Sequence, residues 1–325
     1  IPTHHPAQGG GTAGEAPPSF EVPGDSQKGP QKVPAEWSAR EVPAGAQAGP
    51  QMQVPQMQVP ADSRAPSEVP AEWSGARGVP ADSSQVQVPT DSPGSILRVL
   101  QQALLLAGDL PPGPLLDLGC ATGRTSFALA AATAATGCQV LGVDLSWPML
   151  RLASEALRHQ RVRYPRRRVG LVYDRREFPV RLDGAERVDF WTADATALPF
   201  PDSTFSAIVA LNVLDCVPSP YDLLAALPRL LVPGGKALFT CPYDWSAGAT
   251  PVEAWLGGHS QRGPAHGASE PPLRALLSPG AHPASLPGVR ILAEEESLPW
   301  RVRLHERSTI EYRLHLVVVE KLRDA

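Results

Sequence analysis

The sequence predicts an α/β fold in which a doubly wound, mostly parallel sheet ends in an antiparallel hairpin at its C-terminal edge. Between residues 115 and 240, strand-like and helix-like patterns alternate at the spacing of crossover connections. A turn containing two glycines follows the first strand, which is where such sheets bind ligands. Near the end of the chain, strand patterns at 301–304 and 312–319 are separated by a short polar turn and indicate the hairpin.

Each expected element has a local signal. Ser95 can cap the first helix, in which Ile96, Leu100 and Leu104 share one face. Gly137 is the expected C-cap of the second, Ala-rich helix. The helices are expected at 96–107, 124–136, 147–157 and 220–231, and the parallel strands at 115–119, 140–144, 188–192, 205–211 and 236–240.

The first 93 residues differ from the rest of the 325-residue chain. They contain 16 of the 37 prolines and no leucine, so they lack the apolar surface that would offset the entropy of ordering. Val-Pro recurs along them, and residues 33–38 (Val-Pro-Ala-Glu-Trp-Ser) are repeated as 69–74. We predict a disordered, low-complexity repeat tail at 1–93 and one domain at 94–325. Trp37 and Trp73 leave two interpretations open: a docking arm for an unknown protein, or a repeat without a partner.

Charge and composition exclude several classes of protein. The net charge is −4, which argues against a general polyanion binder. No segment approaches the roughly 18 consecutive apolar residues of a membrane span, so no membrane partner is expected. We expect a cytoplasmic location and buried, reduced thiols, because no two cysteines have C-x-x-C spacing. The cysteines are Cys120, Cys138, Cys216 and Cys241.

The most informative segment is 115–125, Leu-Leu-Asp-Leu-Gly-Cys-Ala-Thr-Gly-Arg-Thr. Its glycines, Gly119 and Gly123, are four residues apart, so it is not the G-x-G-x-x-G dinucleotide fingerprint. It is not a phosphate loop either, because no Gly-Lys-Ser/Thr follows. Gly119 is expected to let the backbone turn sharply off the strand, and Gly123 to permit the close approach of a ligand.

Three acidic residues are expected around this turn. Asp144 ends the second strand and can accept hydrogen bonds from both hydroxyls of a ribose. Asp194 follows the third strand and can accept one from an adenine amino group, while Asp117 can hold an ammonium group. Together they suit a ligand with a cationic end and no phosphates, a description that S-adenosylmethionine fits.

Residues 115–241 resemble the class I S-adenosylmethionine-dependent methyltransferases, of the kind called type 11. The resemblance rests on four motifs in the family's order, at 117–123, 143–146, 194–209 and 230–235. It implies a Rossmann-like sheet of seven strands with the seventh antiparallel, methyl transfer from S-adenosylmethionine, and no metal site. The cofactor-binding residues would be Asp117, Gly119, Cys120, Ala121, Gly123, Asp144, Leu145, Asp194, Ala195 and Asn212.

A narrower resemblance extends over about residues 115–320. The strings at 242–245 (Pro-Tyr-Asp-Trp), 250–258 and 298–307 are similar to the methyltransferase half of ovothiol-biosynthesis enzymes, which methylates an imidazole nitrogen of a thiolated histidine. The chain departs from that family in two respects. Its tail does not supply the iron-dependent sulfoxide-synthase portion, and a basic stretch is inserted between the second and third strands. The resemblance implies a small-molecule acceptor, with a histidine derivative as the finer hypothesis.

Residues after the fourth and fifth strands are expected to line the acceptor pocket. Asn212 would orient a polar group of the acceptor, and Asp215 would either accept a proton or cap the following turn. Tyr243 would place a hydroxyl on the acceptor, while Trp245 would exclude water or stack on a flat ring. The connection that follows is typical of a lid, although residues 259–285 fit a disordered insertion better.

Arginines suggest an alternative function. Residues 158–181 contain nine of them and are predicted to be a solvated loop or, alternatively, a patch that docks an acidic protein or RNA. Nucleic-acid binding is not expected, because few aromatic residues accompany them. Arg301, Arg303 and Arg307 alternate on a possible strand and would either bind an acceptor carboxylate or stay solvated. The alternative is therefore a protein or RNA methyltransferase that docks through this insertion or the tail.

Overall fold

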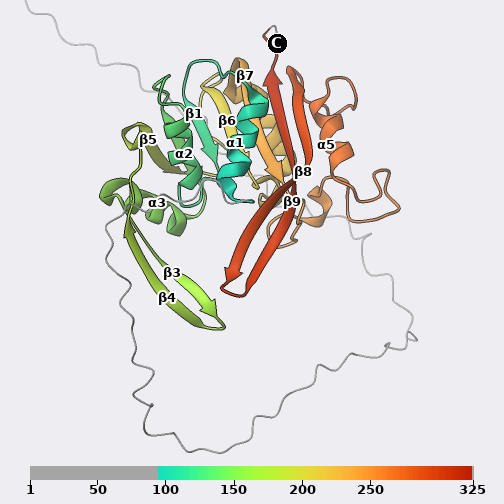
Figure 1. Ribbon diagram of the computed structural model, residues 1–325. Helices are drawn as coiled ribbons and strands as arrows, with labels where there is room; N and C mark the ends of the chain where they lie inside the picture. The colour runs from blue at the N-terminus through green and yellow to red at the C-terminus, as the bar shows by residue number, and fades with distance from the viewer. Residues whose placement is uncertain (1–93, 324–325) are drawn as a thin grey trace, which may run out of the picture. The chain divides into compact units, whose positions relative to one another are not determined.

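A seven-stranded sheet organises the residues that the computed structural model describes, 94–323 (Figure 1). Its strand order is β5-β2-β1-β6-β7-β9-β8. Neighbouring strands from β5 to β7 are parallel, whereas β9 is antiparallel to both β7 and β8. This arrangement confirms the predicted fold. The strands are β1 (Leu115–Leu118), β2 (Val140–Asp144), β5 (Val188–Thr192), β6 (Phe205–Leu211), β7 (Leu231–Cys241), β8 (Val289–His305) and β9 (Ser308–Lys321).

Helices cover both faces of the sheet, as the doubly wound prediction requires. Leu115 of β1 belongs to a core cluster with residues of α1 and α2, whereas its neighbour Leu116 belongs to a cluster with residues of α4 and α5. All four residues of β1 are buried, because a central strand is covered on both faces. The helices are α1 (Ile96–Ala107), α2 (Arg124–Ala132), α3 (Trp147–His159), α4 (Pro220–Leu230) and α5 (Glu270–Leu277).

The predicted tail, 1–93, lies outside the described residues together with Trp37 and Trp73. The division of the chain at residue 93 therefore stays a prediction. Among the helices in the described range, none has the length and apolar character that crossing a bilayer would require.

The first helix begins as predicted but buries a different stripe. The Ser95 hydroxyl accepts a hydrogen bond from the Arg98 N–H, at 3.3 Å. The buried residues are Val99, Leu100, Ala103 and Ala107, while Ile96 and Leu104 are only partly buried. Alanines on the buried stripe let the helix lie close to the sheet, which propensity and spacing alone do not reveal.

The second helix is shorter than predicted. It ends at Ala132, with Thr133 as its C-cap, rather than at residue 136 with Gly137 as the cap. A distant side chain contacts its terminal carbonyl groups, because the Arg187 guanidinium donates to the carbonyl oxygens of Ala130 and of the C-cap residue Thr133. A helix end needs partners for its last carbonyls, and here a residue more than 50 positions downstream in the chain provides them.

The arginine-rich insertion is not the loop that was predicted. It forms a hairpin of two strands, β3 (Arg161–Val169) and β4 (Val172–Pro179). Opposite charges face each other across this hairpin, as in the ion pair between Arg161 and Glu177 at 2.8 Å. The rings of Tyr164 and Phe178 meet edge to face, with centroids 6.4 Å apart. Cross-strand pairs of this kind stabilise strands that carry many charges.

Two further predictions about local structure are wrong. Residues 259–285 were expected to be disordered, yet they contain α5, which buries Leu273, Leu276 and Leu277 in the main core. The four cysteines are all free, but Cys216 is exposed rather than buried. It lies in the 3₁₀ helix η3 (Leu214–Cys216), beyond the end of β6.

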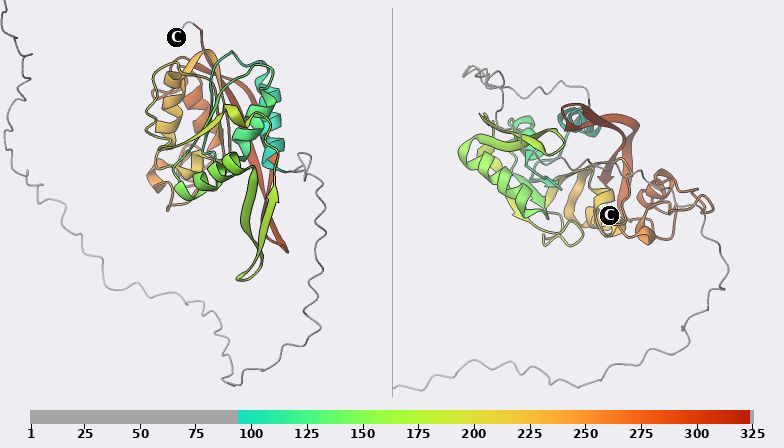
Figure 2. Two further views of the ribbon diagram at one scale, coloured as in Figure 1. Left: turned by 90° about the vertical axis from the view of Figure 1, so that its left-hand side faces the viewer. Right: turned by 90° about the horizontal axis from the view of Figure 1, so that it is seen from below.

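Two hairpins project beyond the same edge of the sheet, the edge at which the parallel strands end (Figures 1 and 2). One is β3–β4, and the other is the outer part of β8–β9, whose strands are longer than predicted. Their tips are joined, because the Glu306 N–H donates to the Arg168 carbonyl oxygen at 3.0 Å. The Glu306 carboxylate also pairs with Arg166, at 3.1 Å. The two hairpins therefore form an arch across the carboxyl edge.

Candidate functional site

A cavity of about 950 Å³ lies at the carboxyl edge of the sheet. This volume is near the upper end of the roughly 300–1,000 Å³ that is usual for ligand pockets. The turn between β1 and α2 forms one wall, the start of α1 and the end of β6 form others, and the β8–β9 hairpin closes a fourth side. Among the predicted site residues, Asp117, Gly119, Cys120, Ala121 and Asn212 line it. The sheet topology thus brings together segments almost 100 residues apart.

The backbone of the glycine turn bends sharply after β1, as was predicted for Gly119. Gly119, Ala121 and Gly123 all have positive φ, at +71°, +49° and +79°. The Gly123 N–H donates to the Cys120 carbonyl oxygen at 2.8 Å and closes the turn. A side chain on Gly123 would meet the Phe190 ring at 2.5 Å. Gly123 is therefore required by packing between β5 and α2, and its predicted role in the close approach of a ligand stays a prediction.

Asp117 is the most buried carboxylate of the site, with 2% of its surface exposed. Its Oδ2 accepts hydrogen bonds from the hydroxyls of Thr125 and Ser126, both at 2.6 Å. Burial raises its pKa to about 6, although these two hydroxyls oppose the shift. Thr125 and Ser126 were not among the predicted site residues. Their position in the first turn of α2, directly after the glycine turn, is the signal that points to them.

Asp144 lies against the glycine turn. Its Oδ2 accepts a hydrogen bond from the Ala121 N–H at 2.8 Å, and its Oδ1 accepts one from the Ser146 N–H at 2.7 Å. The carboxylate thus holds the turn and the start of α3 together. Each oxygen retains a lone pair for a further donor. The neighbouring Leu145 is 69% exposed.

Asp194 follows β5 and binds its own turn. Its Oδ1 accepts hydrogen bonds from the N–H and the hydroxyl of Thr196, at 2.8 and 2.7 Å. These bonds hold the pKa of Asp194 below its usual range, so the carboxylate is ionised near neutral pH. Ala195, the next residue, packs against the main core.

Asn212 carries an unpaired donor. Its side-chain Oδ1 accepts a hydrogen bond from the Thr240 hydroxyl at 2.7 Å, while its backbone N–H donates to the Thr240 carbonyl at 2.9 Å. These bonds hold the residue at the end of β6 with a φ of +58°. Its Nδ2 is buried without a hydrogen-bond partner among the described residues. An unpaired buried donor is costly, so this group is suited to bind a ligand atom.

Asp215 binds a neighbouring loop. Its Oδ2 accepts a hydrogen bond from the Asp244 N–H at 2.9 Å, which connects η3 to the segment after β7. Burial raises the pKa of Asp215. The residue does not line the cavity. Instead of capping the following turn, its carboxylate accepts this hydrogen bond from a residue 29 positions away.

Tyr243 and Trp245 do not line the cavity. The Tyr243 hydroxyl is 2.6 Å from Nδ1 of the buried His315, and burial raises the pKa of that hydroxyl. Trp245 donates from Nε1 to the Ser269 hydroxyl at 2.9 Å. The rings of Tyr243, Trp245 and Trp255 form a stack with successive centroids 6.3 Å apart. The described structure therefore places these residues between β7 and α5.

The β8–β9 hairpin contributes residues that the predicted site did not include. Trp300, Val302 and Thr309 line the cavity together with Arg301 and Arg303, and Arg124 of α2 lines the opposite side. Of these, sequence reasoning considered only the arginines of β8, as possible ligands of an acceptor carboxylate. The alternation of charges along 301–307 was the available signal, but the bend that brings the hairpin over the glycine turn is a tertiary feature.

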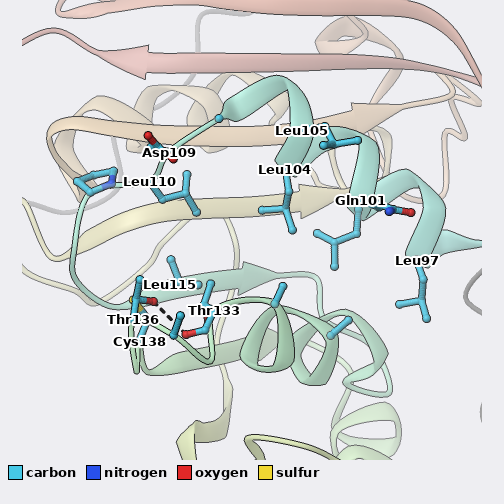
Figure 3. A pocket seen from close by; sticks show the side chains of 16 residues that line it. Leu97, Gln101, Leu104, Leu105, Asp109, Leu110, Leu115, Thr133, Thr136 and Cys138 are labelled. Atoms are coloured by element: carbon cyan, nitrogen blue, oxygen red, sulfur yellow. Dashed lines mark hydrogen bonds between the residues drawn. The ribbon is translucent and has the colours of Figure 1, made fainter.

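A second cavity, of about 730 Å³, lies between α1 and α2 (Figure 3). Leu97, Leu104, Leu105 and Leu110 point into it. It contains none of the predicted site residues. Within residues 94–323, no group of three or more His, Cys, Asp or Glu side chains is placed to hold a metal ion.

Known proteins are similar to the central part of the chain. Residues 116–239 match the family model described as "Methyltransferase domain". A demethylmenaquinone methyltransferase of Thermus thermophilus is 34% identical over 143 residues, which cover 44% of this chain and 53% of the relative. One of Clavibacter sepedonicus is 36% identical over 122 residues, covering 38% of each chain. The 27-O-demethylrifamycin SV methyltransferase of Amycolatopsis mediterranei is 29% identical over 134 residues, which cover 40% of each chain. The chain therefore spans between about a third and a half of the length of these relatives.

Solved structures are similar over a larger part of the chain. A SAM-dependent methyltransferase of Methanosarcina mazei is 22% identical, covers 66% of this chain and 94% of that chain, and has a TM-score of 0.42. Phosphoethanolamine N-methyltransferase 2 of Haemonchus contortus, in complex with S-adenosyl-L-methionine, is 25% identical, covers 46% of this chain and 29% of that chain, and has a TM-score of 0.35.

Proposed function

We propose that the chain uses its methyltransferase domain, residues 116–239, to transfer a methyl group from S-adenosylmethionine to a small-molecule acceptor. One observation carries the proposal. A single cavity at the carboxyl edge holds the glycine turn, the buried carboxylate of Asp117 and the unpaired amide of Asn212. The relatives whose names include small molecules, such as demethylmenaquinone, support a small acceptor for this chain as well.

The donor set fits this cofactor. The Asp117 carboxylate would hold the ammonium group, and Asn212 Nδ2 would donate to a ligand oxygen. Asp144 would accept hydrogen bonds from the ribose hydroxyls, and Asp194 would accept one from the adenine amino group. Gly119, Cys120, Ala121 and the nearby Leu145 and Ala195 would surround the ligand without adding charge. When bound, the cofactor supplies a methyl group attached to a positively charged sulfur.

The protein's own residues contribute alignment and the exclusion of water. The glycine turn is held rigidly by Asp144 and by its internal hydrogen bond, so the ligand meets a preorganised backbone. Among the residues lining the cavity, Asp117 supplies the one carboxylate, and it is engaged by two hydroxyls. A neutral acceptor nitrogen needs no strong base, and an imidazole is partly neutral near pH 7.

The resemblance at 242–258 and 298–307 supports an imidazole nitrogen of a histidine derivative as the first acceptor to test. The decisive experiment incubates the full chain with methyl-labelled S-adenosylmethionine and a panel of imidazoles, quinones, thiols, peptides and RNA. Label transfer to one small molecule supports the proposal. Transfer only to peptide or RNA would instead support the alternative, in which the β3–β4 hairpin or the tail docks a macromolecule.

Asp144→Ala is expected to weaken binding of S-adenosylhomocysteine by about 1–3 kcal/mol, because the ribose hydroxyls would lose an acceptor. The Ala121 N–H would also lose its bond to Oδ2, which loosens the glycine turn. Titration calorimetry measures the loss. Asp189→Ala is the matched control, since Asp189 is an exposed acid on the neighbouring β5 whose carboxylate accepts hydrogen bonds from the Phe190 N–H and from Trp191 Nε1. Unchanged affinity in Asp144→Ala would refute the ribose assignment.

Tyr243→Phe and Trp245→Ala test the acceptor side. If these residues contact the acceptor, its KM or kcat should worsen while cofactor affinity stays unchanged. The lost aromatic contact should cost about 0.5–1.5 kcal/mol beyond the cost of the lost buried area. If they act only through packing, the variants should instead lower the thermal midpoint, because Tyr243 and Trp245 are bonded to His315 and Ser269. Steady-state kinetics and calorimetric unfolding, measured on the same preparations, separate the two outcomes.

A further inference from the structure

The side chains that line the cavity at the carboxyl edge carry more positive than negative charge. Three arginines line it: Arg124 at the start of α2, and Arg301 and Arg303 on β8. Arg301 pairs with Glu311 at 2.6 Å, and Glu311 also pairs with Arg313 at 3.0 Å. Within residues 94–323, no ion pair joins Arg124 or Arg303 to an acidic side chain. Asp117 is the only carboxylate in the lining, so the lining carries more positive than negative charge.

The register of the β8–β9 hairpin shows which lining residues lie beside Arg303. Arg301 is opposite Glu311 and Arg303 is opposite Thr309, so these four side chains share one face of the ribbon. A Cβ atom on Gly94 would lie 2.8 Å from Arg301 Cγ, and Gly94 itself lines the cavity. Thr309 lines it as well. Arg303 therefore shares a ribbon face with Arg301 and Thr309, which also line the cavity, while Trp300 and Val302 line it from the other face.

The acids near the hairpin tips are already paired. Glu306 binds Arg166 and lies 4.0 Å from Arg168. Asp174 lies within 3.8 Å of the same two arginines. Glu177 binds both Arg161 and Arg175. The arch is thus held in place by ion pairs that use its acids, and none is left to neutralise Arg303.

The two free guanidinium groups exceed what the cofactor needs, since S-adenosylmethionine has one carboxylate. Arg124 directly follows the glycine turn and is the nearer candidate for that carboxylate. Arg303 comes from the β8–β9 hairpin, about 180 residues downstream, which lines another side of the cavity. Its guanidinium group is exposed, and an anionic group of an acceptor in the cavity would supply the partner that it lacks among the described residues.

We infer that Arg303 binds a carboxylate or phosphate group of the acceptor, so that the acceptor is an anionic small molecule. This inference rests on the proposed function and adds the chemical class of the substrate. A guanidinium group binds either anion through two parallel N–H donors, which would also fix the orientation of the acceptor relative to the methyl group.

The test measures binding rather than turnover, with the full chain. S-adenosylhomocysteine is first titrated into wild type, Arg124→Gln, Arg303→Gln and Arg307→Gln. Each protein saturated with it is then titrated with acetate and, separately, with inorganic phosphate, which distinguishes the two anions. Arg307 is the matched control, because it is an exposed arginine at the tip of the same hairpin and does not line the cavity.

We expect wild type and Arg307→Gln to bind one of the two anions, and Arg303→Gln to bind it at least about tenfold more weakly, as for the loss of a charge-assisted hydrogen bond. Affinity for S-adenosylhomocysteine should be unchanged in Arg303→Gln and reduced in Arg124→Gln. Equal anion binding by wild type and Arg303→Gln, with normal S-adenosylhomocysteine binding, overturns the inference and leaves the proposed function intact. Failure of wild type to bind S-adenosylhomocysteine contradicts the proposed function and, with it, this inference.

Discussion

Gly119→Ala is expected to abolish detectable binding of S-adenosylhomocysteine and to destabilise the domain. A Cβ atom at this position would collide with Val213 Cγ2, and the φ of +71° is one that alanine adopts only with strain. The backbone strain should cost about 1–2 kcal/mol and the overpacking about 1–3 kcal/mol. Relief of the collision would move the turn that lines the cavity, so cofactor binding should fail before the protein unfolds. Chemical denaturation and titration calorimetry measure the two effects.

Gly137→Ala is the matched control. Gly137 has nearly the same φ, +66°, but a Cβ atom there would meet nothing within 4 Å. It should therefore show the strain without the collision, and its cofactor affinity should equal that of wild type. The double variant Gly119→Ala, Val213→Ala should recover part of the lost stability. Normal cofactor binding by Gly119→Ala would show that the glycine turn does not contact the cofactor.

The affinity for S-adenosylhomocysteine is expected to fall below pH 6. Burial raises the pKa of Asp117 to about 6, and only the ionised carboxylate attracts the ammonium group of the ligand. Protonation should therefore weaken binding by about tenfold for each pH unit below that value. Calorimetric titrations between pH 5 and pH 8 measure the slope.

Asp117→Asn separates this effect from others, because the amide oxygen can still accept hydrogen bonds from Thr125 and Ser126. Its affinity should be low and independent of pH. Asp194→Asn should keep the pH dependence of wild type, since the pKa of Asp194 is shifted downward and it stays ionised over the same range. A pH-independent affinity in wild type would show that Asp117 does not hold the ammonium group.

The same carboxylate affects stability with the opposite sign. The folded protein binds a proton at Asp117 more tightly than the unfolded chain, whose value is near 3.8. Its contribution to stability is therefore fully present below about pH 4 and is lost as the pH rises through 6. The shift corresponds to at most about 3 kcal/mol. Asp117→Asn should remove this contribution from the pH profile of the free energy of unfolding. The ligand therefore binds best where the empty site is least stable.

Local patterns in the sequence were sufficient to predict the parallel strands and the glycine turn. Mostly apolar strands such as β1 and β6 are typical of a sheet that is covered on both faces, so their composition indicates their position. The need for positive φ at Gly119 and the acid at the end of β2 are likewise properties of short segments. For this reason the cofactor side of the candidate site was largely predictable.

Only the tertiary structure decided how the rest is arranged, because the partners are far apart in the chain. Arg187 contacts the end of α2 through carbonyl groups 54 and 57 residues away. Cross-strand ion pairs make a hairpin of the arginine-rich insertion, whose charge alone suggested a solvated loop. Tyr243 meets His315 across 72 residues, and the lid-like sequence around it packs on the core. The length and bend of the β8–β9 hairpin place Arg303 beside the glycine turn. Sequence periodicity indicates which face of an element is buried, but it does not indicate which residues cover that face. The acceptor side of the site depends on such long-range contacts.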